Sequence, residues 1–272
     1  MKFYRCFITD MKKILLSPYF IIGITAFVFM CFTSSIYFDF STNREYNVFE
    51  TFLNYRNVDD YTVSAEYISR YGFGGWISTF LSILVAFPFI NIICDENQNG
   101  AKRYIISRVG VLNFSVSKIL TAIITSALIC LVGYLIFTAF VYLMFPSLSS
   151  MSEAAQENAY FPESYIQKLT EIVLQGVAAG LIPLFLSAFM QNKYFCLCIP
   201  FFVSYFRHTV SNKVFCDTGN YNIASLIAPD SVNLITYENE MRMAAIIIYS
   251  AVLLTVSVVF YISQKGRTDN GT

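Results

Sequence analysis

Long apolar runs separated by short polar connections make up most of the chain. At about 1.5 Å of rise per residue, a helix needs roughly 20 apolar residues to cross a hydrocarbon layer about 30 Å thick. Six runs meet or approach this length, and the fifth of them is short and contains a proline. We therefore predict an all-α polytopic membrane protein in which the single domain 1–272 has six transmembrane helices, at residues 18–38, 73–94, 114–145, 168–190, 194–206 and 241–263.

The segment before the first span, residues 1–17, has its apolar side chains at helical intervals and carries basic residues against Asp10 alone. This pattern predicts an amphipathic helix that lies on the membrane surface. We do not expect a cleaved signal peptide, because the apolar run that follows is too long and no small-residue cleavage site occurs before Asp39.

Two of the connections between the predicted spans have distinctive sequence patterns. Residues 39–72 are polar and rich in acidic groups and tyrosines, which is typical of either a solvated connector or a lid over a substrate path. Residues 207–240 contain apolar pieces too brief to cross a membrane, and these predict a re-entrant or interfacial element at about 222–233. The sequence leaves open whether 207–240 is re-entrant.

The densest group of charges lies between the second and third spans, at residues 95–118. Within it, Gly100 and Gly110 bracket a short stretch whose apolar and basic residues have helical spacing. We predict a helix of about two turns at the membrane surface, ending in a glycine cap. Residues 95–113 would form the connection that contains this helix.

The third span is longer than a bilayer needs, which predicts a tilt or a helical extension continuous with the preceding loop. Asn113 or Ser115 would cap its helix, and the ammonium group of Lys118 would extend to the membrane surface. In the fourth span, Gly176 and Gly180 have the G-x-x-x-G spacing that lets two helix backbones approach closely. They predict either helix packing within the chain or an interface between subunits.

Composition supports the membrane assignment. Of the 272 residues, 56% are hydrophobic and 13% are charged, and the mean hydropathy is +0.56, which is more apolar surface than a soluble domain can bury. No basic patch interleaved with aromatic residues indicates nucleic-acid binding. Seven cysteines are present, but the pair Cys196 and Cys198 has no second ligand pair nearby, so we expect no metal site.

Charge is distributed unequally between the two sides of the predicted membrane. Six spans place both termini and residues 95–113 on one side. That side has most of the basic residues, while of the 18 carboxylates it has only Asp10, Asp95, Glu96 and Asp269. Because basic segments stay in the cytoplasm, we predict a multi-pass protein of the cell membrane with both termini cytoplasmic.

The centres of the predicted spans lack charge, and their most polar side chains are Asn91 and Gln175. Ion-coupled transporters and intramembrane proteases need ionisable groups or metal ligands there, so the sequence argues against both classes. The only histidine, His208, lies at a span end, which indicates a surface group rather than a catalyst. The chain also has no G-x-x-x-x-G-K-[ST] loop, so we predict no catalytic residues and no bound ATP.

The connection between the second and third spans resembles that of a known family. It has an acidic pair, an Asn-Gly turn, a basic pair, a Ser-Arg pair and then Ser-x-Ser-Lys at the start of a long apolar helix. This order is similar to the same loop in permease subunits of type-2 ABC transporters, where the loop docks on a separate ATPase. The resemblance implies this coupling role for Asp95, Glu96, Gly100, Lys102, Arg103, Tyr104, Ile105 and Arg108.

The same resemblance implies the partners and the function. Two cytoplasmic ABC ATPases would bind ATP and Mg²⁺, and a second permease subunit, identical or different, would complete the transporter. This chain, itself neither an enzyme nor a binder of cofactors, would be the membrane-spanning part of an exporter for an amphipathic or apolar cargo, such as an antimicrobial peptide. The alternative is a stand-alone membrane immunity or assembly factor that acts by binding, with residues 95–113 serving only to set the topology.

Overall fold

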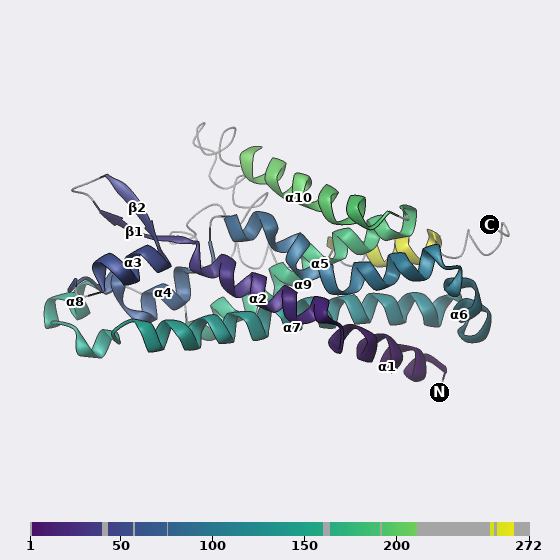
Figure 1. Ribbon diagram of the computed structural model, residues 1–272, viewed down its shortest axis with the longest axis horizontal. Coiled ribbons are helices and arrows are strands. Elements are labelled where there is room, and N and C mark those ends of the chain that lie inside the picture. The colour runs from purple at the N-terminus through teal and green to yellow at the C-terminus, as the bar shows by residue number, and fades with distance from the viewer. Residues whose placement is uncertain are drawn as a thin grey trace.

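The computed structural model describes residues 2–39, 43–56, 58–74, 76–159, 164–190, 192–210, 251–252 and 255–263. Most of them are helical, and they form an elongated bundle (Figure 1). The helices along the bundle are α1 (Lys2–Leu15), α2 (Pro18–Phe32), α5 (Trp76–Gln98), α7 (Val111–Met144), α9 (Tyr165–Phe189) and α10 (Lys193–Val210).

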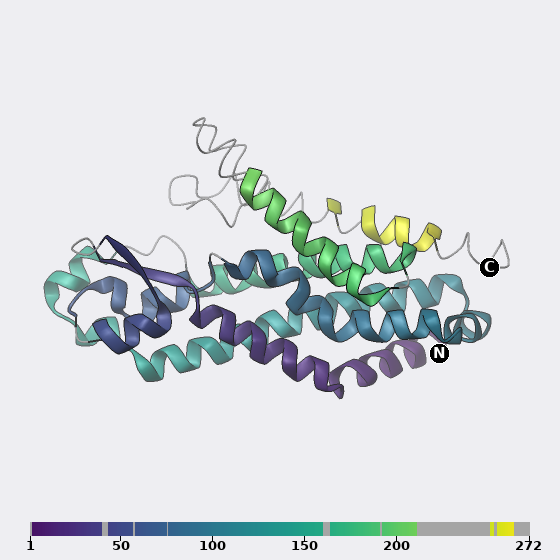
Figure 2. The same ribbon diagram turned by 45° about the horizontal axis from the view of Figure 1, so that its top comes forward.

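Shorter elements occupy the two ends of the bundle (Figures 1 and 2). One end carries the short helix α6 (Ala101–Val109) and the start of α1. The opposite end carries β1 (Ser35–Asp39), β2 (Arg44–Asn47), α3 (Val48–Tyr55), the 3₁₀ turn η1 (Tyr61–Val63), α4 (Ala65–Tyr71), the 3₁₀ turn η2 (Leu148–Ser150) and α8 (Glu153–Asn158).

Three helices in the described part of the chain are long and apolar enough to cross a membrane: α5, α7 and α9. Helices α1 and α2 meet at a bend of 58° and form a fourth candidate if the bent pair is taken as one span. Helix α10 is apolar over a shorter length. These helices indicate membrane association. Most of the predicted sixth span and of segment 207–240 lies outside the described residues, although 251–252 and 255–263 are helical.

The predicted first span, residues 18–38, is not one continuous helix. Helix α2 ends at Phe32, and the amide and hydroxyl of Thr33 both donate to the carbonyl of Met30, at 3.1 and 2.8 Å. With 15 residues, α2 is about 22 Å long, which is too short to cross the hydrocarbon layer alone. The prediction was therefore wrong over residues 33–38.

A two-stranded sheet follows α2, so the fold is not purely α. Strand β1 pairs antiparallel with β2. Its residues Ile36, Tyr37 and Phe38 are β-branched or aromatic, and such side chains favour an extended strand. The ring of Tyr37 also packs against Tyr55 of α3, with the two ring centroids 4.7 Å apart, which holds the sheet onto the helix.

The described residues between 35 and 71 (35–39, 43–56 and 58–71) form a packed unit, which we call the cap, so the solvated-connector interpretation of 39–72 was wrong for them. Val48, Val63, Ala65 and Ile68 of the cap are completely inaccessible to solvent. They extend the apolar cluster that also contains residues of α2, α5 and α7. These apolar residues are scattered among acidic ones in the sequence, which concealed the buried face. The lid interpretation stays a prediction.

Hydrogen bonds join the cap to the connection that follows α7. The Leu148 amide donates to the Glu66 carboxylate at 2.8 Å, and the Ser152 amide donates to the Asp59 carboxylate at 3.1 Å. In addition, the buried Tyr134 hydroxyl of α7 donates to the carbonyl of Ser69. Acidic side chains at this end therefore serve as acceptors for backbone amides within the fold.

Close packing between α7 and α9 explains the G-x-x-x-G spacing. Gly176 and Gly180 are buried in α9, and a side chain at either position would overlap with Cys130 or Ser126 of α7. Small residues are needed where two helix backbones come this close. The pair therefore allows close helix packing within the chain, and the alternative of a subunit interface stays a prediction.

The end of the bundle that carries α6 gathers segments from the whole chain. There the Asn97 amide group donates to the carbonyl of Ser187 at 3.4 Å, which joins α5 to α9. The hydroxyl of Ser263 donates to the carbonyl of Ala188 at 3.4 Å, and Phe260 is buried in the apolar cluster of this end. The last described helix therefore packs near the ends of α5 and α9.

Candidate functional site

Helix α6 is set between two glycines that reverse the chain direction. Gly100 has φ 67° and Gly110 has φ 89°, backbone conformations that other residues rarely adopt. The Gly110 amide donates to the carbonyl of Ile106 at 2.8 Å and closes the helix. The predicted short helix with a glycine cap is therefore present, and α5 continues to Gln98 before it.

The start of α7 differs from the prediction. Neither Asn113 nor Ser115 caps it, because α7 begins at Val111 directly after Gly110. The Asn113 side-chain amide instead donates to the carbonyl of Val109, the last residue of α6, at 3.0 Å. Helix α7 thus has the extension toward the loop that its length predicted, and Asn113 ties it to α6.

One face of α6 is open to solvent. It presents Arg103, Tyr104, Ser107 and Arg108, and the Tyr104 side chain is 76% exposed. Within the described part of the chain, neither arginine forms an ion pair. The opposite face, with Lys102, Ile105, Ile106 and Val109, is half-buried toward the bundle.

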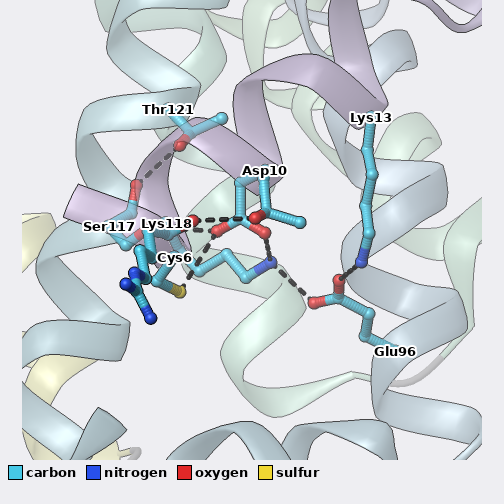
Figure 3. A network of polar contacts seen from close by, with 9 residues as sticks. Cys6, Asp10, Lys13, Glu96, Ser117, Lys118 and Thr121 are labelled. Atoms are coloured by element: carbon cyan, nitrogen blue, oxygen red, sulfur yellow. Dashed lines mark hydrogen bonds and ion pairs between the residues drawn. The ribbon is translucent and has the colours of Figure 1, made fainter. Parts of the chain in front are cut away.

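A network of charged side chains from α1, α5 and α7 lies inside the bundle (Figure 3). The Lys118 ammonium of α7 lies between two carboxylates, 2.9 Å from Asp10 Oδ1 of α1 and 2.6 Å from Glu96 Oε2 of α5. The other oxygen of Glu96 is 3.2 Å from Lys13 Nζ of α1. The Ser117 hydroxyl donates to Asp10 Oδ2 at 3.0 Å. We call Asp10, Lys13, Glu96 and Lys118 the ion cluster.

Burial makes this cluster energetically important. The side chains of Lys118 and Asp10 are 3% and 4% exposed, and that of Glu96 is 10% exposed, while Lys13 reaches solvent. An ion removed from water pays a desolvation penalty of several kcal/mol, which only close partners offset. Two carboxylates face two ammonium groups, one of them the partly exposed Lys13, so the charge of the whole cluster is balanced.

The structure redistributes the predicted coupling residues. Arg103, Tyr104 and Arg108 lie on the exposed face of α6, and Asp95 is exposed in the last turn of α5. Lys102 and Ile105 are half-buried on the other face of α6, and Gly100 forms the turn before it. Glu96 is 8% exposed and belongs to the ion cluster, so its carboxylate is directed to Lys118 and Lys13 instead of outward.

The prediction that Lys118 extends to the membrane surface was wrong. Its ammonium group is retained inside by Asp10 and Glu96, and it also lies 5.5 Å from the centre of the Phe114 ring. Asp10 was the residue that sequence reasoning missed. The signal was present, because Asp10 lies one helical turn from Ile14 on the side of α1 that carries its apolar residues.

This arrangement is suited to holding helices together and to docking. Every member of the ion cluster has a partner, and the cluster joins α1, α5 and α7 toward the end of the bundle that carries α6 (Figure 1). Within the described residues, no group of three or more His, Cys, Asp or Glu side chains could hold a metal ion. The exposed basic face of α6 is one surface that is available for an acidic partner.

No protein-family model, no curated protein and no solved structure matches this chain.

Proposed function

We propose that the chain is the membrane-spanning permease subunit of an ATP-driven ABC exporter. The observation that carries the proposal is the geometry of α6. It is a short helix with an exposed face of Arg103, Tyr104 and Arg108, fixed by two glycine turns between the long apolar helices α5 and α7. A binding surface attached in this way to two candidate spans can transmit a push from outside the bundle into its interior.

The docking step uses the exposed side chains of α6. The two arginines would form charge-assisted hydrogen bonds with carboxylates of a cytoplasmic ATPase, and Tyr104 would supply the apolar contact. Arg and Tyr are the side chains most often found at the energetic centre of protein interfaces. Ile105, which the resemblance placed in the same contact, would instead hold α6 against the bundle.

The ion cluster gives the docking surface a rigid base. Because Lys118 binds both Asp10 and Glu96, displacement of α5 and α7 must carry α1 with it or break buried ion pairs. Closure of two ATPases on ATP would therefore move α1, α5 and α7 together at this end. ATP and Mg²⁺ would reside on the ATPases, and a second permease subunit would form the other half of the transport path.

The expected cargo is an amphipathic or apolar molecule, such as a peptide. Inside the bundle, the polar side chains away from the ion cluster are mainly hydroxyls and amides, including Thr79, Ser82, Asn91, Gln175 and Ser204. These groups can accept or donate hydrogen bonds without binding an ion strongly. We place α6 on the cytoplasmic side because it carries three basic residues.

Co-purification tests the docking role. The full chain, tagged and expressed in its own cells, is solubilised in detergent and the retained proteins are identified by mass spectrometry. We expect an ABC ATPase in stoichiometric amount, and we expect Arg103→Glu combined with Tyr104→Ala to release it. Arg103→Glu replaces the attraction to the carboxylates of the ATPase by repulsion, and Tyr104→Ala removes the ring that makes the apolar contact.

A matched control uses Arg44→Glu, which reverses one exposed charge on β2 at the opposite end of the molecule. This variant should retain the ATPase. If neither the parent nor the control retains an ATPase, the stand-alone immunity or assembly factor becomes the better account. If Arg103→Glu combined with Tyr104→Ala retains as much ATPase as the parent, the contact with the ATPase lies elsewhere on the chain.

A further inference from the structure

Helix α1 presents three different faces along its length. Asp10 and Ile14 are buried against the bundle. Beside them, Tyr4, Ile8, Met11 and Leu15 follow each other at intervals of four, three and four residues and so form one stripe. Tyr4 is 65% exposed and Leu15 is 37% exposed, so this apolar stripe lacks a full covering within the described structure.

The third face of α1 is cationic. Arg5 and Lys12, seven residues apart, are exposed on the same side of the helix, and within the described residues neither forms an ion pair. The side chain of Lys13 is also 48% exposed, although it contacts Glu96. The only acidic residue of α1, Asp10, is turned inward and neutralised by Lys118. The accessible surface of α1 therefore carries positive charge alone.

The occupant of this surface must meet two requirements. It has to be apolar along the stripe of Tyr4 and Leu15, and anionic along the neighbouring line of Arg5 and Lys12. The border between the acyl chains and the headgroups of an anionic bilayer has both properties. An acidic protein surface would satisfy Arg5 and Lys12 but would leave the apolar stripe in contact with water.

We infer that α1 is a binding site for anionic phospholipid headgroups, with Arg5 and Lys12 as the headgroup ligands. The apolar stripe enters the acyl region next to these headgroups. Asp10 contributes by its burial, since a carboxylate on the outer surface of α1 would repel the same headgroups. The inference is independent of the ATPase contact at α6.

Lipid quenching of a tryptophan on α1 tests this site. The full chain with Tyr4→Trp and Trp76→Phe has its only tryptophan on α1, because Trp76 is the only natural one. It is placed in bilayers of phosphatidylcholine and phosphatidylglycerol in which one lipid or the other has brominated acyl chains. We expect stronger quenching by brominated phosphatidylglycerol. Each of Arg5→Gln and Lys12→Gln should lower this preference by up to about fivefold, because a basic residue near an anionic surface contributes about this factor.

One control accompanies the measurement. The double variant Arg44→Gln and Arg56→Gln removes two exposed arginines at the opposite end and should leave the preference at position 4 unchanged. The inference is overturned if the preference at position 4 persists in the Arg5 and Lys12 double variant. It is also overturned if no brominated lipid quenches this tryptophan, which would assign the cationic face to an acidic protein.

Discussion

Lys118 shows how a charged side chain is accommodated beside an apolar helix bundle. Its ammonium group contacts the carboxylates of Asp10 and Glu96, which precede Lys118 in the sequence by 108 and 22 residues. Removing one partner of such a pair leaves an uncompensated buried charge, which costs more than the pair contributes when it is intact. The ion cluster is therefore a position where a single substitution has a large effect.

We predict that Lys118→Met lowers the free energy of unfolding by about 3–5 kcal/mol, because the buried Asp10 then loses its counter-ion and Glu96 keeps only Lys13. Unfolding in detergent, followed by circular dichroism, measures the loss. Lys13→Met is the matched control and should cost less than about 1 kcal/mol, since the Lys13 side chain is 48% exposed. The triple variant Asp10→Asn, Glu96→Gln and Lys118→Met should recover much of the loss. An equal cost for Lys118→Met and Lys13→Met would contradict this account.

A pH-dependent contact is expected at Asp59. Hydrogen bonds from Ser152 hold the pKa of the Asp59 carboxyl below its usual value. A lowered folded-state pKa means that the contact stabilises the fold above the unfolded-state pKa of about 3.9 and is lost as the pH falls through the lower folded-state value. Hydrogen exchange of the Ser152 amide should therefore be slow at pH 6.

Replacing Asp59 provides the corresponding comparison. Asp59→Asn should accelerate exchange at Ser152 at pH 6, because an amide oxygen is a weaker acceptor than a carboxylate. After correction for intrinsic exchange, the difference between variant and parent should vanish below the folded-state pKa. A difference that persists in strong acid would show that ionisation of Asp59 does not stabilise the contact.

At the scale of elements, α7 and α9 illustrate packing that depends on small residues. A Cβ added at Gly176 would overlap with the Cys130 sulfur, which is the far end of a short side chain. We predict that Gly176→Ala lowers the free energy of unfolding by about 1–3 kcal/mol, as overpacking of a closely packed core does. Combining it with Cys130→Ala should recover part of the loss. If Gly176→Ala changed only the oligomeric state, the glycine would belong to an interface between chains.

The sequence predicts an element well where the signal is local. The two glycines around α6 and the helical spacing between them define that helix, because both its ends and its faces are encoded within eleven consecutive residues, Gly100 to Gly110. The cap was not predictable in the same way. Its strand pair and buried residues depend on contacts with α2, α5 and α7, which sequence periodicity does not report.

The ion cluster was hidden for a similar reason. Asp10 and Lys118 lie 108 residues apart, so pattern analysis of either segment alone shows one basic helix and one span with a lysine near its end. The pairing results from the docking of α1 against α7, which is a property of the tertiary structure. The exposed face of α6, in contrast, could be predicted because it needs no partner within the chain.

At the scale of the whole molecule, the two ends of the bundle differ in charge and in construction. The end with α6 and α1 exposes Arg5, Lys12, Arg103 and Arg108 against Asp95. The other end exposes Arg44 and Arg56 against a larger set of acidic residues, namely Glu45, Glu50, Asp59, Glu153 and Glu157. Long apolar helices connect the two ends. A membrane positioned across these helices would leave the two ends in different compartments, and we predict that the basic end is cytoplasmic.

Cysteine labelling in intact cells tests this orientation. In a background with Cys6→Ser, Cys198→Ser and Cys216→Ser, the remaining natural cysteines are buried. A membrane-impermeant maleimide should label Glu157→Cys on α8 in intact cells, and it should label Ser107→Cys on α6 only after the membrane is opened. Both positions are exposed in the folded chain, so a difference between them reports the compartment and not the burial. Labelling of Ser107→Cys in intact cells would reverse the orientation and remove α6 from reach of a cytoplasmic ATPase. Labelling of both positions from outside would mean that the long helices do not separate the two ends across the membrane.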